Sequence, residues 1–164
     1  MITTCITALR GIVPAALALV FAALLAAPAG AQDRSTPEAA QAMVERAIAH
    51  YDAVGEEQAF ADFSNAEGDF IENDLYVIVS TLEGIYKTHA YNVALIDNPV
   101  LMDIQDVNGD FPVRRIVESA ASSPDGGWID YVWVNPVNDA LETKRVYVQQ
   151  HAGYAFAVGY YEAN

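Results

Sequence analysis

The sequence predicts an α+β domain in which a long N-terminal helix and a short second helix pack on a five-stranded antiparallel sheet. Three observations support this class. An amphipathic helical pattern opens the folded part of the chain. Five short segments rich in β-branched and aromatic residues follow, and tight turns join the last three of them. The order helix, helix, two strands, helix, three strands predicts helices that cover one face of the sheet.

Residues 1–31 have the pattern of a secretory signal peptide. Arg10 precedes an apolar run over residues 12–27 that is interrupted only by Pro14. Ala29 and Ala31 form an A-x-A cleavage site, which places the cut after Ala31. The alternative is an uncleaved membrane anchor, although the run is short for a span of about 20 residues. We therefore expect a signal peptide over residues 1–31 and one domain over residues 32–164.

The expected mature chain is strongly acidic. Removal of residues 1–31 takes away Arg10 and no acidic residue, which leaves 7 Lys and Arg against 22 Asp and Glu, a net charge of −15. This charge argues against nucleic acid as a partner, because phosphate binding needs clustered basic residues. Cys5 is the only Cys and falls in the signal peptide, so no disulfide is expected. Export without disulfides indicates a periplasmic or secreted protein, and no later apolar run predicts a membrane span.

The expected first helix begins at the string Ser35-Thr36-Pro37-Glu38, which combines a cap residue, a first-turn proline and an early acid. Apolar residues then recur at a spacing of three or four up to Val54, which gives the helix one apolar face. Gly55 ends this helix. Residues 56–63 are expected to form a second short helix that buries Ala59, Phe60 and Phe63.

The middle of the chain alternates between strands, loops and one further helix. A polar loop over residues 64–73 precedes a strand over residues 75–79, and Glu83-Gly84 turns the chain into a second strand over residues 85–91. Residues 92–106 are expected to be irregular, and Asn108-Gly109 forms a turn. A third helix over residues 111–122 follows from the spacing of Val113, Ile116, Val117 and Ala120.

Three strands close the domain, over residues 128–134, 143–151 and 154–161. Short connections over residues 135–139 and 152–153 predict that these strands pair antiparallel. Alternation along the first of them places Ile129, Tyr131 and Trp133 on one face and Trp128 on the other.

Several short strings follow one another in a specific order and spacing. They are residues 50–55 (HYDAVG), 59–63 (AFADF), 68–70 (GDF), 74–77 (DLYV), 127–133 (GWIDYVW), 135–136 (NP), 144 (K), 147–148 (YV) and 158–161 (VGYY). The series resembles a single Cache domain of type 2, the extracytoplasmic PAS-like sensor module of bacterial chemoreceptors and histidine kinases. The resemblance covers roughly residues 38–162. It implies a PAS-like sheet, binding of a small molecule, often an organic acid, and no catalysis. For a free-standing domain it implies either a binding protein or a sensor that passes its state to a separate membrane signalling partner.

Aromatic residues are the first candidates for ligand binding. Eight of the 16 aromatic residues that follow the signal peptide lie between Trp128 and Tyr161. Tyr and Trp side chains combine an apolar wall with a polar group, which suits a small-ligand pocket, although strands also favour aromatic residues for packing alone. The residues to which we assign this role, with weight from the resemblance, are Tyr76, Tyr131, Trp133 and Tyr147.

Two polar residues complete the expected site. His89, in the second strand with Lys87 and Tyr91 on its face, could donate a hydrogen bond to a ligand carboxylate. Lys144 lies beside an aromatic face and is a candidate anion anchor. Three positions separate Lys144 from Tyr147, so both line one pocket only if a bulge intervenes or if Lys144 lies in the preceding loop. A strongly negative chain needs such a local cation to hold an anion, so we expect a small carboxylate. An amine boxed by aromatic rings is the alternative.

The sequence offers no pattern for catalysis, a cofactor or a metal. The motifs of the nucleophile elbow, the zinc proteases and the dinucleotide-binding loop are absent. The three histidines lack metal-ligand spacing, and the acids between Asp103 and Asp110 do not fit the calcium loop. The alternative to a binding domain is a small exported enzyme on a cone-shaped fold resembling the nuclear transport factor 2 group. Such an enzyme should hold a buried Asp–His pair, whereas a binding domain should hold a cation or donor set among aromatic rings.

Overall fold

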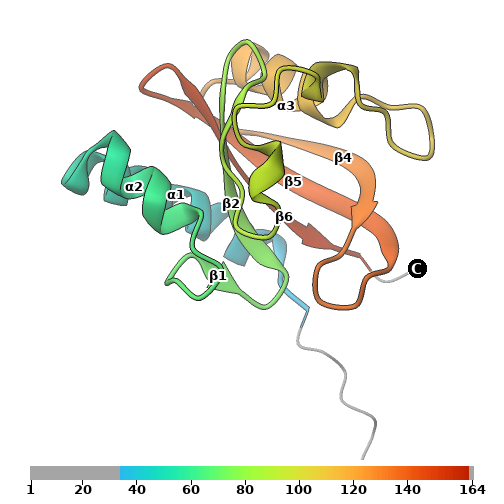
Figure 1. Cartoon of the computed structure of the whole chain (residues 1–164), viewed down its shortest axis with the longest axis horizontal. Helices are drawn as coiled ribbons and strands as arrows, with labels where there is room; N and C mark the ends of the chain where they lie inside the picture. Colours follow the sequence, from blue (N-terminus) through green and yellow to red (C-terminus); the bar gives the residue numbers. More distant parts are fainter. Residues whose placement is uncertain (1–33, 163–164) are drawn as a thin grey trace, which may run out of the picture. The chain divides into compact units, whose positions relative to one another are not determined.

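The computed structural model describes residues 34–162, so the predicted signal peptide lies outside the described residues. Figure 1 shows the order of the elements along the chain. They are α1 (Pro37–Val54), α2 (Glu56–Phe63), β1 (Ile71–Glu72), β2 (Leu75–Thr81), β3 (Tyr86–Thr88), the 3₁₀ turns η1 (Val93–Leu95) and η2 (Leu101–Asp103), α3 (Pro112–Ser122), β4 (Gly127–Val134), β5 (Leu141–His151) and β6 (Tyr154–Tyr161). The predicted α+β class is confirmed.

Local sequence signals determine where α1 begins and ends. The Thr36 hydroxyl accepts a hydrogen bond from the backbone N–H of Ala39 at 3.2 Å, and Pro37 occupies the first turn. Gly55 has a positive φ of 85°, which favours glycine, and its N–H donates to the carbonyl of Tyr51 at 2.9 Å. These contacts confirm both predicted ends of the helix.

The sheet has six strands rather than the predicted five. Its order is β1-β2-β6-β5-β4, with β3 also paired to β2, and all these pairs are antiparallel. The additional strand, β1, lies in the segment predicted as a polar loop. The second predicted strand is shorter than expected because the Thr88 hydroxyl accepts from the Val79 N–H at 2.8 Å and donates to the Val77 carbonyl at 3.3 Å. The side chain thus takes part in the pairing, and the chain leaves the sheet at His89.

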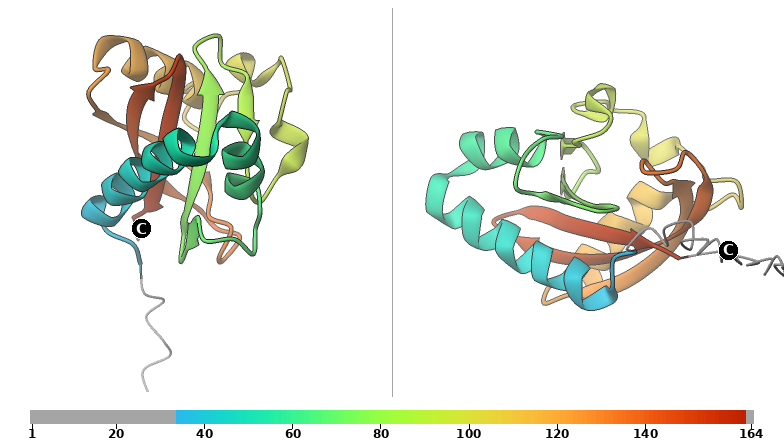
Figure 2. Two further views of the ribbon diagram at one scale, coloured as in Figure 1. Left: turned by 90° about the vertical axis from the view of Figure 1, so that its left-hand side faces the viewer. Right: turned by 90° about the horizontal axis from the view of Figure 1, so that it is seen from below.

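The helices cover both faces of the sheet, which corrects the prediction that they share one face. α1 and α2 pack on the face that carries Leu75, Val77 and Val79, which we call the helix face. α3 packs on the opposite face, which carries Tyr76 and Ile78 and which we call the cavity face. Figure 2 shows α1 along one side of β5 and β6 and the segment with η1 and η2 on the other. β2 is buried on both faces, so each face requires a cover.

Asp106 fastens the loop before α3 to the edge of the sheet. Its carboxylate accepts hydrogen bonds from the backbone N–H groups of Asn108, Asp110 and Val132, each at 2.9 Å. Asp106 therefore serves a turn and a strand contact, whereas Asp103 and Asp110 form ion pairs with Arg114 and Arg115. Within residues 34–162 there is no cluster of three or more His, Cys, Asp or Glu that could hold a metal ion, and no helix is both long and apolar enough to cross a membrane.

Candidate ligand-binding site

A small cavity lies between the cavity face and the segment that carries η1, η2 and the start of α3. We call it the inner cavity. Its volume, measured as the space open to the centre of a water molecule, is about 20 Å³. This is enough for about one water molecule or one small polar group. Its lining residues are Tyr76, Ile78, Tyr86, His89, Leu95, Leu101, Ile104, Pro112, Val113, Tyr131 and Trp133.

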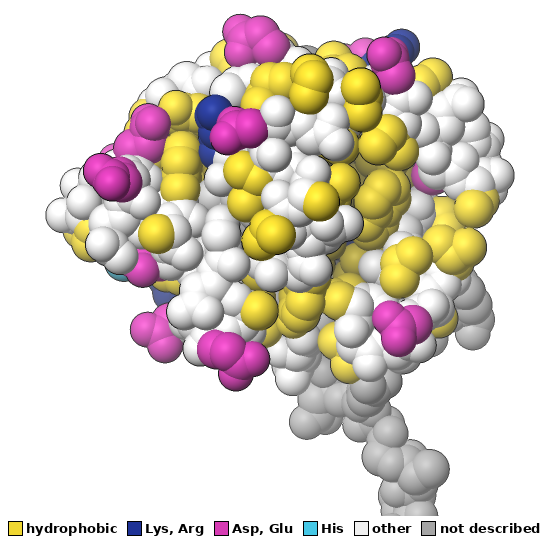
Figure 3. All heavy atoms as spheres, in the orientation of Figure 1, with side chains coloured by type: hydrophobic (Ala, Val, Ile, Leu, Met, Phe, Trp, Pro, Cys, Tyr) yellow, Lys and Arg dark blue, Asp and Glu magenta, His cyan; other side chains and the backbone are white. Residues whose placement is uncertain are grey.

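A wider space adjoins the inner cavity, and we call it the outer recess. By the same measure its volume is about 310 Å³. The two spaces share Tyr76, His89, Leu95 and Trp133, so a ligand can extend from one into the other. The residues that line the outer recess alone are Tyr91, Asn92, Val134, Pro136 and Asp139. Figure 3 shows hydrophobic side chains gathered in a hollow on this side of the domain.

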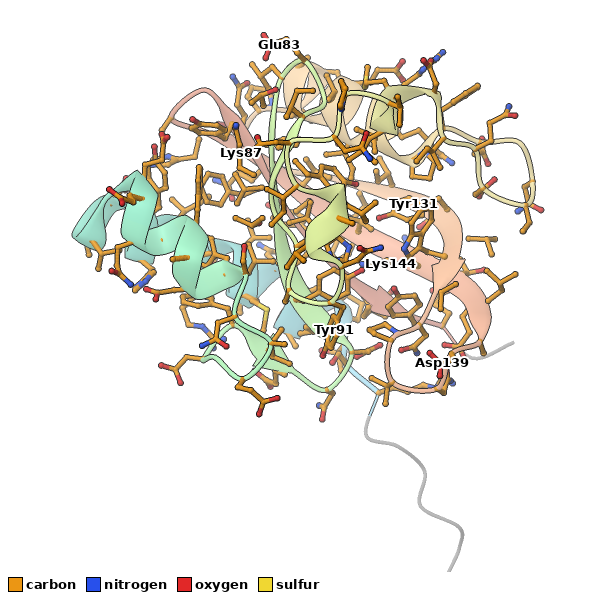
Figure 4. All side chains as sticks on the ribbon, in the orientation of Figure 1. Glu83, Lys87, Tyr91, Tyr131, Asp139 and Lys144 are labelled. Carbon is orange, nitrogen blue, oxygen red and sulfur yellow. The ribbon has the colours of Figure 1, made fainter. Side chains whose placement is uncertain are left out.

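Lys144 is the buried cation of the site. Its Cα pairs with Tyr131 in β4 and with Tyr161 in β6, which puts it in a row of aromatic residues across the cavity face. The side chain is fully buried. Its Nζ lies 3.8 Å from the ring centroid of Tyr76 and 5.1 Å from that of Tyr161, and it has no hydrogen-bond partner among the described residues. Figure 4 shows Lys144 and Tyr131 on the same side of the sheet, between η1 and β4.

Gly159 makes room for the Lys144 side chain. A Cβ atom at this position would lie 2.7 Å from the Lys144 Cε, 2.7 Å from the Val146 Cγ2 and 2.9 Å from the Arg145 carbonyl oxygen. Val77 pairs with Val158, so Tyr76 and Gly159 each lie one position beyond this pair, and the lysine passes over the glycine to reach the tyrosine ring. Glycine at position 159 therefore permits the cation–π contact.

The environment weakens the positive charge of Lys144. Burial lowers the pKa of Lys144 from 10.5 to about 7, because the ammonium loses hydration, and the nearby carboxylate of Asp74 opposes this change. Asp74 is itself buried and accepts hydrogen bonds from the N–H groups of Tyr161 at 2.8 Å and Ser35 at 3.2 Å. The domain therefore holds a lysine that is ready to take up or release a proton near neutral pH.

His89 is held as a neutral donor. Burial, and then the charge of Lys144, lower the pKa of His89 from 6.5 to about 3. The backbone N–H of Asn92 donates to its Nδ1 at 3.1 Å, so the proton of the neutral ring resides on Nε2. An Nε2–H group can donate to a carboxylate without carrying a charge. The expected strand neighbours differ, because the strand ends before His89 and Lys87 instead pairs with Asp97 at 2.6 Å.

Buried tyrosine hydroxyls add further donors. Burial raises the pKa of Tyr76 and of Tyr131 well above 10, so both phenols keep their protons at any physiological pH. Tyr131 and Trp133 lie in contact on the cavity face with ring centroids 6.2 Å apart, as the alternation in β4 predicts. His89 and Tyr131 thus place hydrogen-bond donors on an otherwise apolar space, and Lys144 lies directly behind the Tyr76 ring that forms part of its wall.

Tyr147 is not brought together with the other five expected site residues. It belongs to the core of the helix face, where its ring centroid lies 5.2 Å from that of Trp128. Its hydroxyl donates to the Asp125 carbonyl at 3.4 Å. β5 keeps an unbroken register with β4 and β6 over residues 144–148, so Lys144 and Tyr147 point to opposite faces. The bulge that would have brought both into one pocket is absent from this part of β5.

One wall of the site was not predicted from the sequence. Leu95, Leu101 and Ile104 come from the segment predicted as irregular, and they close the inner cavity opposite the sheet. The signal was the number of apolar residues in a segment without periodicity, since such residues need a surface to pack on. Tyr86 and Tyr161 were also not predicted as site residues, because an aromatic residue in a strand is explained equally well by packing in the sheet.

The Asp–His pairs of the domain lie away from the cavity. His50 Nε2 is 2.7 Å from Asp62 Oδ2, and His151 Nε2 is 2.7 Å from Asp52 Oδ1. Both pairs join elements on the helix face, and none of the four side chains is buried. In the cavity, His89 faces the N–H of Asn92 instead of a carboxylate. The cavity therefore lacks the Asp–His pair expected of the enzyme alternative among the described residues, and it has neutral donors among aromatic rings with the Lys144 cation behind its wall.

These features define a class of protein. An antiparallel sheet with helices on its outer face and a small cavity under a loop on its inner face is the architecture of a PAS-like sensory domain. The family described as Single Cache domain 2 matches residues 30–161, and the chain belongs to this family. The resemblance seen in the sequence is thereby confirmed. No curated protein matches the chain.

Solved structures of chemotaxis proteins share the fold. A methyl-accepting chemotaxis protein from Vibrio parahaemolyticus is 22% identical with a TM-score of 0.61, over 76% of this chain and 84% of the other. A periplasmic sensor domain of a chemotaxis protein is 22% identical with a TM-score of 0.58, over 77% and 90%. A Cache chemosensory domain described with carboxylic acid recognition is 19% identical with a TM-score of 0.58, over 77% and 88%.

Proposed function

We propose that this chain is an extracytoplasmic sensor domain that binds a small organic acid through Lys144. The observation that carries the proposal is the Lys144 ammonium, which is fully buried and has no hydrogen-bond partner within residues 34–162. A buried charge without such a partner is costly, and a ligand carboxylate is the group that would complete it. No Lys or Arg is among the described residues that line the two spaces directly, and the Lys144 Nζ lies 3.8 Å from the ring centroid of Tyr76, which lines both.

In this proposal, ligand binding replaces the cation–π contact between Lys144 and Tyr76 with a stronger hydrogen bond to the ligand carboxylate. The Nζ lies behind the ring of Tyr76, which forms part of the cavity wall. A carboxylate reaches the Nζ when this ring moves aside, and a charge-assisted hydrogen bond then replaces the cation–π contact. The Nε2–H of His89 and the hydroxyl of Tyr131 supply two further donors. Displacement of Tyr76 would be the first structural consequence of binding.

The wider setting of this proposal is export and signalling. The signal-peptide pattern of residues 1–31 and the periplasmic sensor domain among similar structures support an extracytoplasmic site of action. Mass spectrometry of the exported protein tests the predicted start at Gln32, and an intact Met1 in the membrane fraction would contradict it. In this setting the domain passes its ligand state to a membrane signalling partner.

Ligand titration with matched lysine variants tests the proposal. The purified protein, Lys144→Met and Lys87→Met are titrated by calorimetry with straight-chain monocarboxylates of two to six carbons and with alkylamines of the same lengths. The wild type and Lys87→Met should bind at least one acid, and Lys144→Met should lose roughly tenfold or more in affinity, the value of a charge-assisted hydrogen bond. Lys87 is the only other lysine and lies away from the cavity (Figure 4). Acid binding that survives in Lys144→Met would refute the proposal, as would binding of amines alone.

A further inference from the structure

The two spaces differ in size, and this difference constrains the ligand. The inner cavity has the volume of about one polar group, whereas the outer recess is about 310 Å³. A ligand whose carboxylate approaches Lys144 must therefore place most of its remaining atoms in the outer recess. The chemistry of the outer recess then decides which organic acids bind.

The outer recess carries one acidic side chain, Asp139. Among the described residues that line this space, no other is charged at neutral pH, given the neutral state of His89. Asp139 is exposed, and its carboxylate has no hydrogen-bond or ion-pair partner among the described residues. Figure 4 shows Asp139 in the β4–β5 loop, on the same side of the sheet as Lys144 and Tyr91.

A network of hydrogen bonds fixes the loop that presents Asp139. The Asp139 N–H donates to the Asn135 carbonyl at 2.9 Å. The side-chain amides of Asn135 and Asn138 donate to the Glu142 carboxylate at 2.8 and 3.1 Å, and Arg34 donates to the same carboxylate at 2.9 and 3.0 Å. The loop therefore holds Asp139 at a defined place on the rim of the outer recess.

Aromatic rings line the same rim. Tyr91 is 41% exposed and packs edge-on against Tyr76 at 5.2 Å between centroids. Trp133 also lines the recess. The faces of Tyr and Trp attract ammonium and quaternary ammonium groups, so these rings and Asp139 favour a cation at the rim.

We propose, building on the function proposed above, that the ligand is a zwitterion whose carboxylate turns inward to Lys144 and whose ammonium lies in the outer recess between Asp139 and the rings of Tyr91 and Trp133. Amino acids and betaines belong to this class. The charge of the whole chain supports the assignment. A net charge of −14 repels a free anion during approach, whereas a zwitterion has no net charge and meets no such barrier.

Calorimetry with ligands of equal length tests the class. The probes are butyrate, 4-aminobutyrate and butylamine, together with the ω-amino acids of two to six carbons, which measure the distance between the two charged groups. For the best length, the amino acid should bind about threefold to tenfold more tightly than the matching acid, the range of one exposed ion pair or cation–π contact. Asp139→Asn should remove this advantage and leave the affinity for the plain acid unchanged or higher.

A second aspartate provides the control. Asp125→Asn makes the same change in net charge in the α3–β4 turn, where the residue lines neither space. It should keep the advantage of the amino acid, so that a loss seen only in Asp139→Asn is a local effect. An equal loss in both variants would indicate a long-range charge effect and would overturn the inference.

The remaining outcomes separate this inference from the function on which it rests. If plain acids bind as tightly as amino acids at every length, and Asp139→Asn changes neither, the zwitterion is wrong and the acid-binding function stands. If neither class binds the wild type, both proposals are wrong. Butylamine binding that survives in Lys144→Met would also overturn both, because the cation would then bind without an inner carboxylate.

Discussion

Replacement of Lys144 by Met should stabilise the free domain. The pKa of Lys144 falls from 10.5 to about 7 on folding. Because a tenfold change in a proton dissociation constant corresponds to about 1.4 kcal/mol, keeping the ammonium charged in the fold costs about 5 kcal/mol. Met fills the same slot without a charge, so Lys144→Met should recover most of this cost and gain about 3–5 kcal/mol in free energy of unfolding at pH 6, or roughly 10–15 °C in Tm.

The gain should depend on pH in a defined direction. The pKa of Lys144 is lower in the folded state than in the unfolded state, so the unfolded state binds more protons between pH 7 and pH 10.5 and the wild type gains stability over this range. The advantage of Lys144→Met should therefore be full below pH 7 and smaller at pH 9. Urea unfolding at both values measures it, with Lys87→Met as a surface control expected to change stability by less than about 0.5 kcal/mol.

The opposite result would refute the reasoning. If Lys144→Met lost stability at pH 6, the ammonium would be a structural partner of the buried Asp74 carboxylate instead of an uncompensated charge. A ligand panel run on the same samples completes the test, because a bound acid raises the apparent stability of the wild type and should not raise that of the variant.

Three further predictions concern the pH dependence of binding, the two faces of β4 and the contact between Arg34 and the β4–β5 loop. Acid affinity should fall by up to about tenfold per pH unit above pH 7, where free Lys144 loses its proton; calorimetry from pH 6 to pH 9 measures this fall, and a flat profile would contradict it. Trp133→Ala should reduce ligand affinity at least about fivefold and Trp128→Ala less than about twofold, because only Trp133 lines the two spaces; equal losses in folded variants would refute the assignment of the faces. Arg34→Ala should lose about 1 kcal/mol of stability at pH 7 and almost none at pH 2. The reason is that the hydrogen bond from Arg34 is the largest cause that lowers the pKa of Glu142 from 4.5 to about 2. The stability from this contact is present above pH 4.5 and is lost as the pH falls towards 2. Acid unfolding followed by circular dichroism decides this last case, in which an unchanged curve would show that the contact is without effect.

The parts of the fold that could be predicted are those that depend on local chemistry. Thr36 and Gly55 show the ends of α1 because capping and positive φ involve only a few neighbouring residues. The early end of β3 depends on a hydrogen bond between the Thr88 side chain and Val79, nine positions away, which no local pattern reveals. The face on which α3 packs follows from the sheet as a whole. The one local feature that pointed to a helix on the second face was that β2 is apolar on both of its faces.

The same distinction applies to the site. Tyr131 and Trp133 share a face by simple alternation, and the structure places them in one cavity. Alternation also separates Lys144 from Tyr147, and the regular strand shows that this rule outweighed the family resemblance for Tyr147. The neutral state of His89 could not be predicted, because it arises from burial and from the charge of Lys144, which is 55 positions away in the sequence.

The buried charged groups of this domain differ in their hydrogen-bond partners, and this difference supports the proposed role of Lys144. Asp74 accepts two backbone N–H groups, and the Glu142 carboxylate accepts hydrogen bonds from Arg34 and two asparagine amides. Lys144 has no such internal partner among the described residues, although Gly159 leaves the space that its side chain needs. Hydrophobic residues of the same size would be more stable in that slot. The arrangement lowers the stability of the free domain and leaves one strong donor unused, and this is the physical basis of our proposal that Lys144 binds an anion supplied from outside the chain.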